Sequence, residues 1–144
     1  MTILADTITP TATAIRTALV ASTAITATTG QRVYLTSAPD TAAYPHIIMQ
    51  PATAYEQDAT HADLSWQPQQ WDIYAVADTA DAANALVGLV AAALNGQRLT
   101  IGSDKSLVVR RMGTMAANRI RLSDTISKYM AAATMLVGVR TGGA

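Results

Sequence analysis

The sequence predicts a single α+β domain: a mainly antiparallel (mixed) sheet of about four to five strands, with two helices packed on one face. Three observations lead to this fold class. The chain has 144 residues, the length of one domain. Strand-like runs stand on both sides of one clearly amphipathic helix. The chain lacks phenylalanine and cysteine but has 29 alanines and 20 threonines, so its core must consist of closely packed small side chains.

The first predicted element is a helix. Thr9 can cap it, and Pro10 suits the first helical position, where no amide hydrogen is needed. The helix ends in a threonine-rich tail at Gly30. A short extended run over residues 32–35 follows, and the turn-forming residues 37–40 end it.

The next two predicted strands flank a polar loop. Pro45 opens a strand over residues 46–50, and Pro51 removes one ladder donor, which predicts a sheet edge or a bulge there. The polar loop extends from Glu56 to Pro68. A strand over residues 71–76 then places Trp71, Ile73 and Ala75 on one face and Asp72, Tyr74 and Val76 on the other.

The clearest helix begins after its cap residue Thr79 and ends at Asn95 and Gly96. Two strands follow, over residues 107–115 and 128–140, joined by a hairpin or crossover at 118–124. We expect the domain to span residues 1–144.

The two ends, residues 1–8 and 141–144, are expected to be flexible. No window approaches the roughly 20 apolar residues that span a bilayer, so no membrane contact is expected.

The formal net charge is zero, which excludes a generally basic nucleic-acid binder, but the charges are unevenly distributed. Residues 1–97 carry two arginines and eight acids, a charge of −6, and residues 98–144 carry eight basic residues and two acids, a charge of +6. Such a chain can supply complementary patches to copies of itself.

Catalytic and cofactor chemistry have little support. His61 with Asp58 and Asp63 offers metal-ligand types, but a lone histidine in a polar loop is more typical of solvated side chains. His46 follows a proline at a strand start and is interpreted as structural. The sequence has no nucleophile-elbow motif, paired carboxylates or phosphate loop. We therefore expect neither an enzyme nor a cofactor or metal.

The basic residues of the last third are the main functional signal. Arg110 and Arg111 are adjacent on a strand and should point to opposite faces, whereas Arg119 and Arg121 should share a face if that stretch is extended. They either pair with acids of their own or another subunit, or bind DNA phosphates. Base stacking is disfavoured because residues 98–128 contain no aromatic side chain. The candidate acidic partners are Asp72, Asp78 and Asp81, and the candidate interface anchors are Trp66 and Tyr129.

The order of motifs over residues 10–140 resembles the tail completion or tail terminator proteins of long-tailed bacteriophages. The matching motifs are Gly30-Gln31-Arg32-Val33-Tyr34, Ala38-Pro39, Tyr44-Pro45-His46-Ile47-Ile48, a Trp-x-Ile-Tyr strand at Trp71, Thr79-x-Asp81-x-Ala83, and Leu94-Asn95-Gly96. The arginine-rich stretch from Arg110 to Arg121 matches no motif of the family residue by residue.

The resemblance implies a virion protein: a homohexameric ring at the head-proximal end of the tail that stops tube growth and joins the tail to the head connector. Its implied partners are itself, the tail tube protein, connector proteins, and duplex DNA passing through the lumen without sequence specificity. Assembly would take place in the host cytoplasm. Tyr129–Val139 and the edge marked by Pro51 are candidates for strand addition between subunits. The alternatives are another neck component, such as a head-completion protein, or a small DNA- or ligand-binding bacterial domain.

Overall fold

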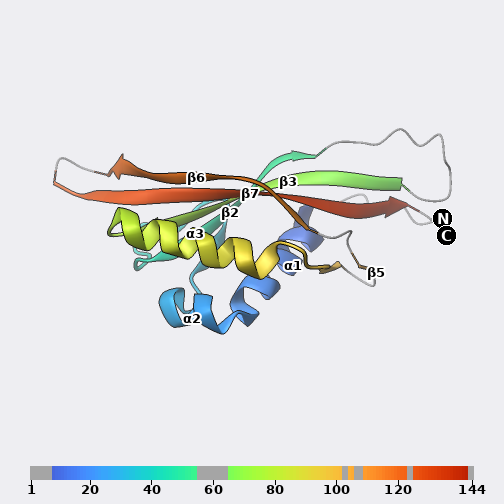
Figure 1. The fold of residues 1–144 in the computed structure, drawn as a ribbon, viewed down its shortest axis with the longest axis horizontal. Helices are drawn as coiled ribbons and strands as arrows, with labels where there is room; N and C mark the ends of the chain where they lie inside the picture. The colour runs from blue at the N-terminus through green and yellow to red at the C-terminus, as the bar shows by residue number, and fades with distance from the viewer. Residues whose placement is uncertain (1–7, 55–64, 102–103, 106–108, 123–124, 143–144) are drawn as a thin grey trace.

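The structure is a computed structural model that describes residues 8–54, 65–101, 104–105, 109–122 and 125–142 (Figure 1). These residues form one mixed five-stranded sheet in the order β1-β2-β3-β7-β6, a small two-stranded sheet, β4-β5, and three helices. The elements in chain order are α1 (Ile8–Ala21), α2 (Thr23–Thr29), β1 (Val33–Leu35), β2 (His46–Ala54), β3 (Ser65–Ala77), α3 (Ala80–Leu94), β4 (Thr100–Ile101), β5 (Asp104–Lys105), β6 (Arg110–Arg121) and β7 (Ser127–Gly142).

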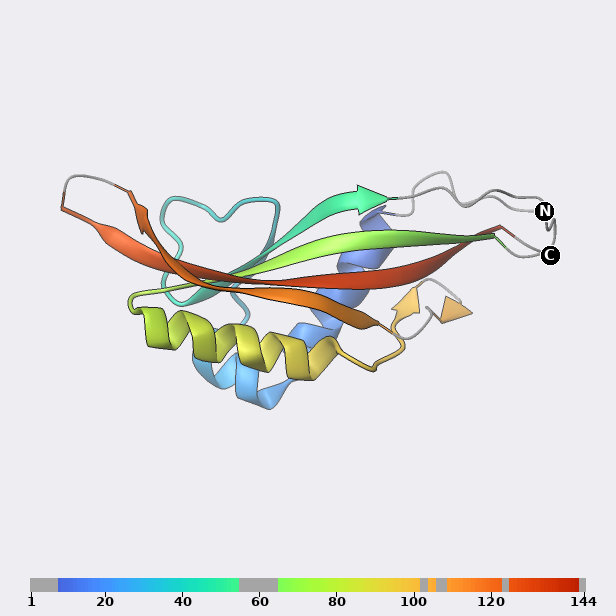
Figure 2. The same cartoon turned by 45° about the horizontal axis from the view of Figure 1, so that its top comes forward.

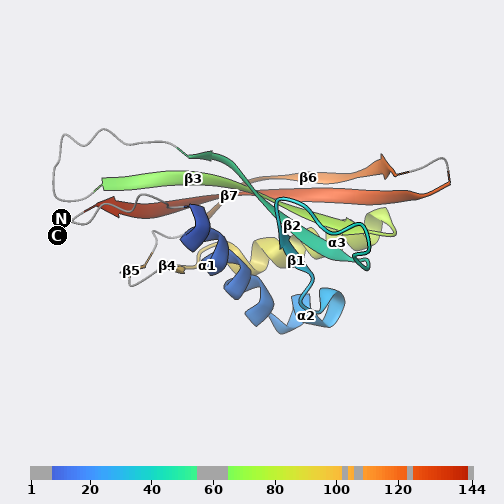
Figure 3. The ribbon, with the colours of Figure 1, turned by 180° about the vertical axis from the view of Figure 1, so that it is seen from behind.

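The helices lie on one side of the sheet, which confirms the predicted α+β layering (Figures 1 and 3). Their number differs from the prediction, because the expected first helix is divided at Ser22 into α1 and α2. Ser22 has an extended conformation, and its hydroxyl accepts a hydrogen bond from the amide of Ile25, as an N-cap does. Gly30, at φ 61°, ends α2 as predicted.

The third helix, α3, has the predicted bounds. The hydroxyl of Thr79 accepts a hydrogen bond from the amide of Ala82 at 3.2 Å, and Asn95 is the C-cap. Leu86, Val90 and Leu94 are buried against the sheet. The alanine-rich body of α3 lets the helix lie close over β3, β7 and β6.

The sheet is mixed because β1 runs parallel to β2, whereas the other neighbours are antiparallel. β1 reaches only as far as Met49 on β2, and a bulge separates Pro51 from Thr53. Pro51 therefore lies at an open edge beside a bulge, as its missing amide hydrogen predicts.

Two element boundaries differ from the prediction. Residues 65–68 were expected in a loop but begin β3, because they pair in register with the long strand β7. Pro68 is tolerated there because, among the described residues, β2 pairs with β3 only up to Gln69, so no described strand needs a donor from Pro68 on that side. β6 was expected to end near residue 115 but continues to Arg121, again in register with β7.

The core lies between the sheet and the helices and is built from small side chains around one large one. Trp71 is fully buried, and its indole N–H donates to Gln69 Oε1 at 3.0 Å. Ala131 and Ala133 of β7 are also buried there, beside Met135. The other side of the sheet carries no helix in the described part of the chain (Figure 2).

Candidate assembly interface

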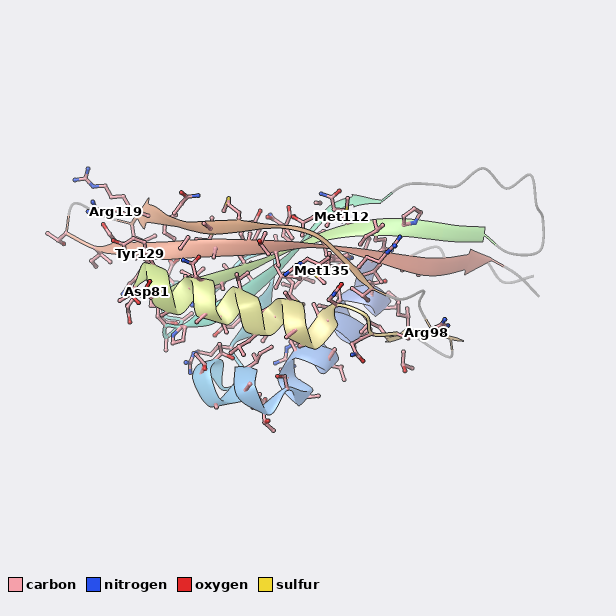
Figure 4. All side chains as sticks on the ribbon, in the orientation of Figure 1. Asp81, Arg98, Met112, Arg119, Tyr129 and Met135 are labelled. Carbon is pink, nitrogen blue, oxygen red and sulfur yellow. The ribbon has the colours of Figure 1, made fainter. Side chains whose placement is uncertain are left out.

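The candidate arginines all lie on β6, the edge strand of the sheet, and all are exposed. Figure 4 labels one of them, Arg119. Arg110 is opposite Leu136 and Arg111 is opposite Met135, which is fully buried beneath α3. Because paired residues share a face, Arg111 lies on the helix side of the sheet and Arg110 on the helix-free side. The predicted opposite orientation is confirmed.

Arg119 and Arg121 lie at the other end of β6, about 25 Å from the first pair when measured along the partner strand β7. They are opposite Tyr129 and Ser127, so they share the helix side, as predicted for an extended stretch. Arg119 Nε donates to Ser127 Oγ at 3.0 Å, and Tyr129 is partly buried against the core. The sequence cluster is therefore two separate pairs of arginines in the structure.

The candidate acids do not neutralise these arginines. Asp72 accepts a hydrogen bond from Thr134 Oγ1 at 2.8 Å, Asp78 pairs with Lys128, and Asp81 is exposed in the first turn of α3. Among the described residues no ion pair joins an acid to Arg110, Arg111 or Arg119. These three guanidinium groups can therefore meet a partner from outside the subunit.

The structure describes the other candidate residues, Trp66 and the possible metal ligands around His61, only in part or not at all. Trp66 lies in β3 opposite Arg140, but its side chain is outside the described residues. His61, Asp58 and Asp63 are outside them as well. In the described segments no three histidine, aspartate or glutamate side chains gather as a metal site would need.

Two asparagines of α3 bind the backbone of β6, a feature that the sequence reasoning missed. Asn95 Oδ1 accepts from the amide of Arg111 at 2.9 Å, and Asn84 Oδ1 accepts from the amide of Ala117 at 2.8 Å. Each bonded amide lies at a bulge, where β6 loses register with β7. Bulges and amides that are already bonded hinder the pairing of another strand with an edge strand. The part of β6 between Arg111 and Ala117 is therefore poorly suited to strand addition.

We expect Asn84→Ala to lower the free energy of unfolding by about 1 kcal/mol, because the amide of Ala117 loses its acceptor. Denaturation in urea measures this loss. Asn118→Ala is the matched control, since this exposed asparagine of β6 should tolerate truncation with little effect. Equal effects of the two substitutions would contradict a stabilising role for the hydrogen bond between the amide of Ala117 and Asn84.

The opposite edge of the sheet, formed by β1 and β2, is also poorly suited to strand addition. Arg16 of α1 donates from Nε to the carbonyl of Val33 and from Nη2 to that of Gln31, which occupies the outer side of β1. Pro51 and its bulge interrupt the open part of β2. Tyr129–Val139, the other candidate for strand addition, lies in β7, which is paired on both sides as far as Leu136. That prediction is wrong for residues 129–136, because a strand with two neighbours cannot accept a third.

A cluster of aromatic side chains holds the segment before β2 against the sheet. His46 is buried, its ring lies between those of Tyr34 and Tyr44, and its Nδ1 donates to the carbonyl of Ala43 at 3.1 Å. Lys128 Nζ lies 4.4 Å from the centre of the Tyr44 ring and pairs with Asp78. The structural role predicted for His46 is thus supported by its burial and contacts.

Burial lowers the pKa of His46, the carbonyl of Ala43 acts in the opposite direction, and the charge of Arg32 lowers the pKa further. The unfolded chain therefore binds a proton at a pH where the folded chain does not. We expect the contribution of His46 to the free energy of unfolding to be complete above about pH 6.5 and to decrease as the pH falls below that value. Urea denaturation between about pH 5 and 7.5 measures this slope, which His46→Gln should reduce. An unchanged slope in His46→Gln would show that other groups cause it.

Comparison with known proteins decides the family. The family model described as "Tail completion protein gp17" matches residues 13–125, which is most of the chain. The chain belongs to the tail completion protein family. It is therefore a structural protein of the phage tail and virion, and not an enzyme.

Structural comparison identifies a solved structure with a similar fold. A chain from the solved structure "Virion of native gene transfer agent (GTA) particle" superposes with a TM-score of 0.69 and 17% identity, covering 94% of this chain and 98% of that one. At this identity the likeness shows a shared fold. No curated protein sequence gives a significant match. None of the helices in the described segments combines the length and apolarity needed to cross a bilayer.

Proposed function

We propose that this tail completion protein forms a homohexameric ring at the head-proximal end of the tail. The ring stops growth of the tail tube and joins the tail to the head connector. Its direct partners are its own copies, the tail tube protein and the connector proteins, and duplex DNA passes through its lumen. The ring assembles in the host cytoplasm and remains in the virion.

One observation supports the proposed ring contact: among the described residues, no ion pair joins an acid to the exposed Arg110 or Arg111 of β6. A head-to-tail ring joins two different surfaces of each subunit, so a subunit that is basic in one part and acidic in another suits it. Residues 1–97 carry a charge of −6 and residues 98–144 a charge of +6. Family membership supports the tail position and excludes the alternative of a bacterial domain without a virion role. Another neck component remains the second candidate.

Loss of the protein should disturb both the control of tail length and the joining of tails to heads. In cells that produce the particle without this chain, we expect tubes of irregular length and heads without tails. Electron microscopy of the lysate measures both, and supplying the chain from a plasmid should restore joined particles. Normal particles in its absence would contradict the proposed function, and tubes of normal length beside unjoined heads would favour the other neck role.

A further inference from the structure

The far end of the β6–β7 hairpin reaches beyond the rest of the sheet (Figures 1 and 2). Residues Asn118–Leu122 and Thr125–Lys128 form this end and are called the arm below. The last pair between β3 and β7 joins Ala77 to Tyr129, so none of the described strands lies beside the arm as a third strand. Arg119, Arg121, Leu122 and Ile126 of the arm are all exposed.

The arm has two chemically different faces. Arg119 and Arg121 lie on the helix side, as their register with β7 shows. The intervening Ile120 is opposite Lys128 and lies on the helix-free side. The amide of Leu122 donates to the carbonyl of Ile126 at 3.0 Å, which continues the register and places both side chains on the same side as Ile120.

The apolar face of the arm is unusually exposed. Leu122 is 53% exposed and Ile126 is 49% exposed, and Met115 on the same face is 40% exposed. Single exposed apolar side chains are ordinary, but here they gather on one face of a projecting hairpin. Buried apolar anchors beside arginines are typical of protein interfaces.

We infer that the arm docks into a cleft on another protein of the particle, with one apolar wall and one acidic wall. Leu122 and Ile126 face the apolar wall, and Arg119 and Arg121 face the acidic wall. The inference rests on the proposed assembly role and assigns its contact with a second kind of protein to these side chains.

A second copy of the chain fits the arm less well. Antiparallel pairing of two arms would bring Arg119 of one copy against Arg121 of the other, and facing like charges destabilise such a pair. The groove between α1 and β4 is lined by small residues but carries Arg98, which would repel the arginines of an inserted arm. DNA fits less well still, because a phosphate backbone offers nothing to Leu122 and Ile126.

Binding of the purified full-length chain to the purified tail tube protein and, separately, to the purified head-side connector protein tests this inference. The variants are Leu122→Asn with Ile126→Asn, and Arg119→Glu with Arg121→Glu. Leu35→Asn is the control for the apolar change, because Leu35 is 47% exposed and lies outside the arm. Arg98→Glu is the control for a reversed charge at an exposed arginine. Thermal unfolding should show that all four proteins are as stable as the wild type.

We expect both arm variants to bind one of the two proteins at least tenfold more weakly and to keep their own oligomeric state, whereas both controls bind normally. If either arm variant bound both proteins as tightly as the wild type does, the inferred docking of the arm into a cleft with an apolar and an acidic wall would be overturned. Loss of self-association in the arm variants would assign the arm to a second copy and overturn the inference. A wild-type chain that binds neither protein contradicts the proposed function itself, which separates that failure from a failure of the arm.

Discussion

Replacing Trp71 with alanine is expected to lower the free energy of unfolding by about 3–5 kcal/mol. Trp71 is fully buried in a core without phenylalanine, where Ala75, Ala131 and Ala133 are among the buried residues. Met135, which lies opposite Trp71 on β7, can fill only part of the space, so a cavity should remain. The substitution also removes the hydrogen bond to Gln69 Oε1.

Thermal and urea denaturation measure this effect, and the midpoint of thermal unfolding should fall by roughly 10–20 °C. Trp71→Phe is the graded control, because it keeps one six-membered aromatic ring and loses the smaller indole ring with its N–H donor. A loss below about 1 kcal/mol in Trp71→Ala would contradict this description of the core.

The second large effect is expected at the start of β6, at Arg110 and Arg111. Arg110→Glu combined with Arg111→Glu should block ring assembly while the monomer stays folded. Both side chains are exposed, so the change leaves the core intact, but two reversed charges at a subunit contact oppose association. Light scattering measures assembly, and the circular dichroism spectrum reports the fold.

Two other outcomes of this experiment have definite meanings. Unchanged assembly in the double variant would contradict a subunit contact at Arg110 and Arg111. If rings form and these arginines line the DNA channel, the wild-type ring should bind duplex DNA in a salt-dependent way, and the variant should lose that dependence. Binding by the wild-type ring that is absent or insensitive to salt would exclude the DNA role.

Local chemistry predicted the elements that are determined by single residues. Thr79 caps α3 through its hydroxyl, Gly30 ends α2 with a positive φ, and Pro51 lies at an open edge beside a bulge. These features depend on backbone donors and dihedral angles, which the residue type itself limits. The family could also be recognised from motifs placed on these same elements.

Features that depend on pairing with distant residues could not be predicted in this way. Pro68 and the glutamines around it are typical of a loop, but register with β7 makes them part of β3. The spacing of Ser22 fits the face of one continuous helix, but in the structure its hydroxyl caps a second helix, α2.

The candidate site shows the same limit. The spacing of the arginines gave their relative faces, because alternation along a strand is local. It did not show that the side chains of Asn84 and Asn95 bind amides of β6, or that Leu122 and Ile126 remain exposed on a projecting hairpin. Those facts depend on which element packs beside β6 and where its neighbours end.

Electron microscopy of the purified chain mixed with tail tubes is the most direct test of the proposed ring. We predict a sixfold ring with an open lumen at one end of each tube. Tubes with bare ends, together with a chain that remains monomeric in light scattering at high concentration, would contradict the proposal.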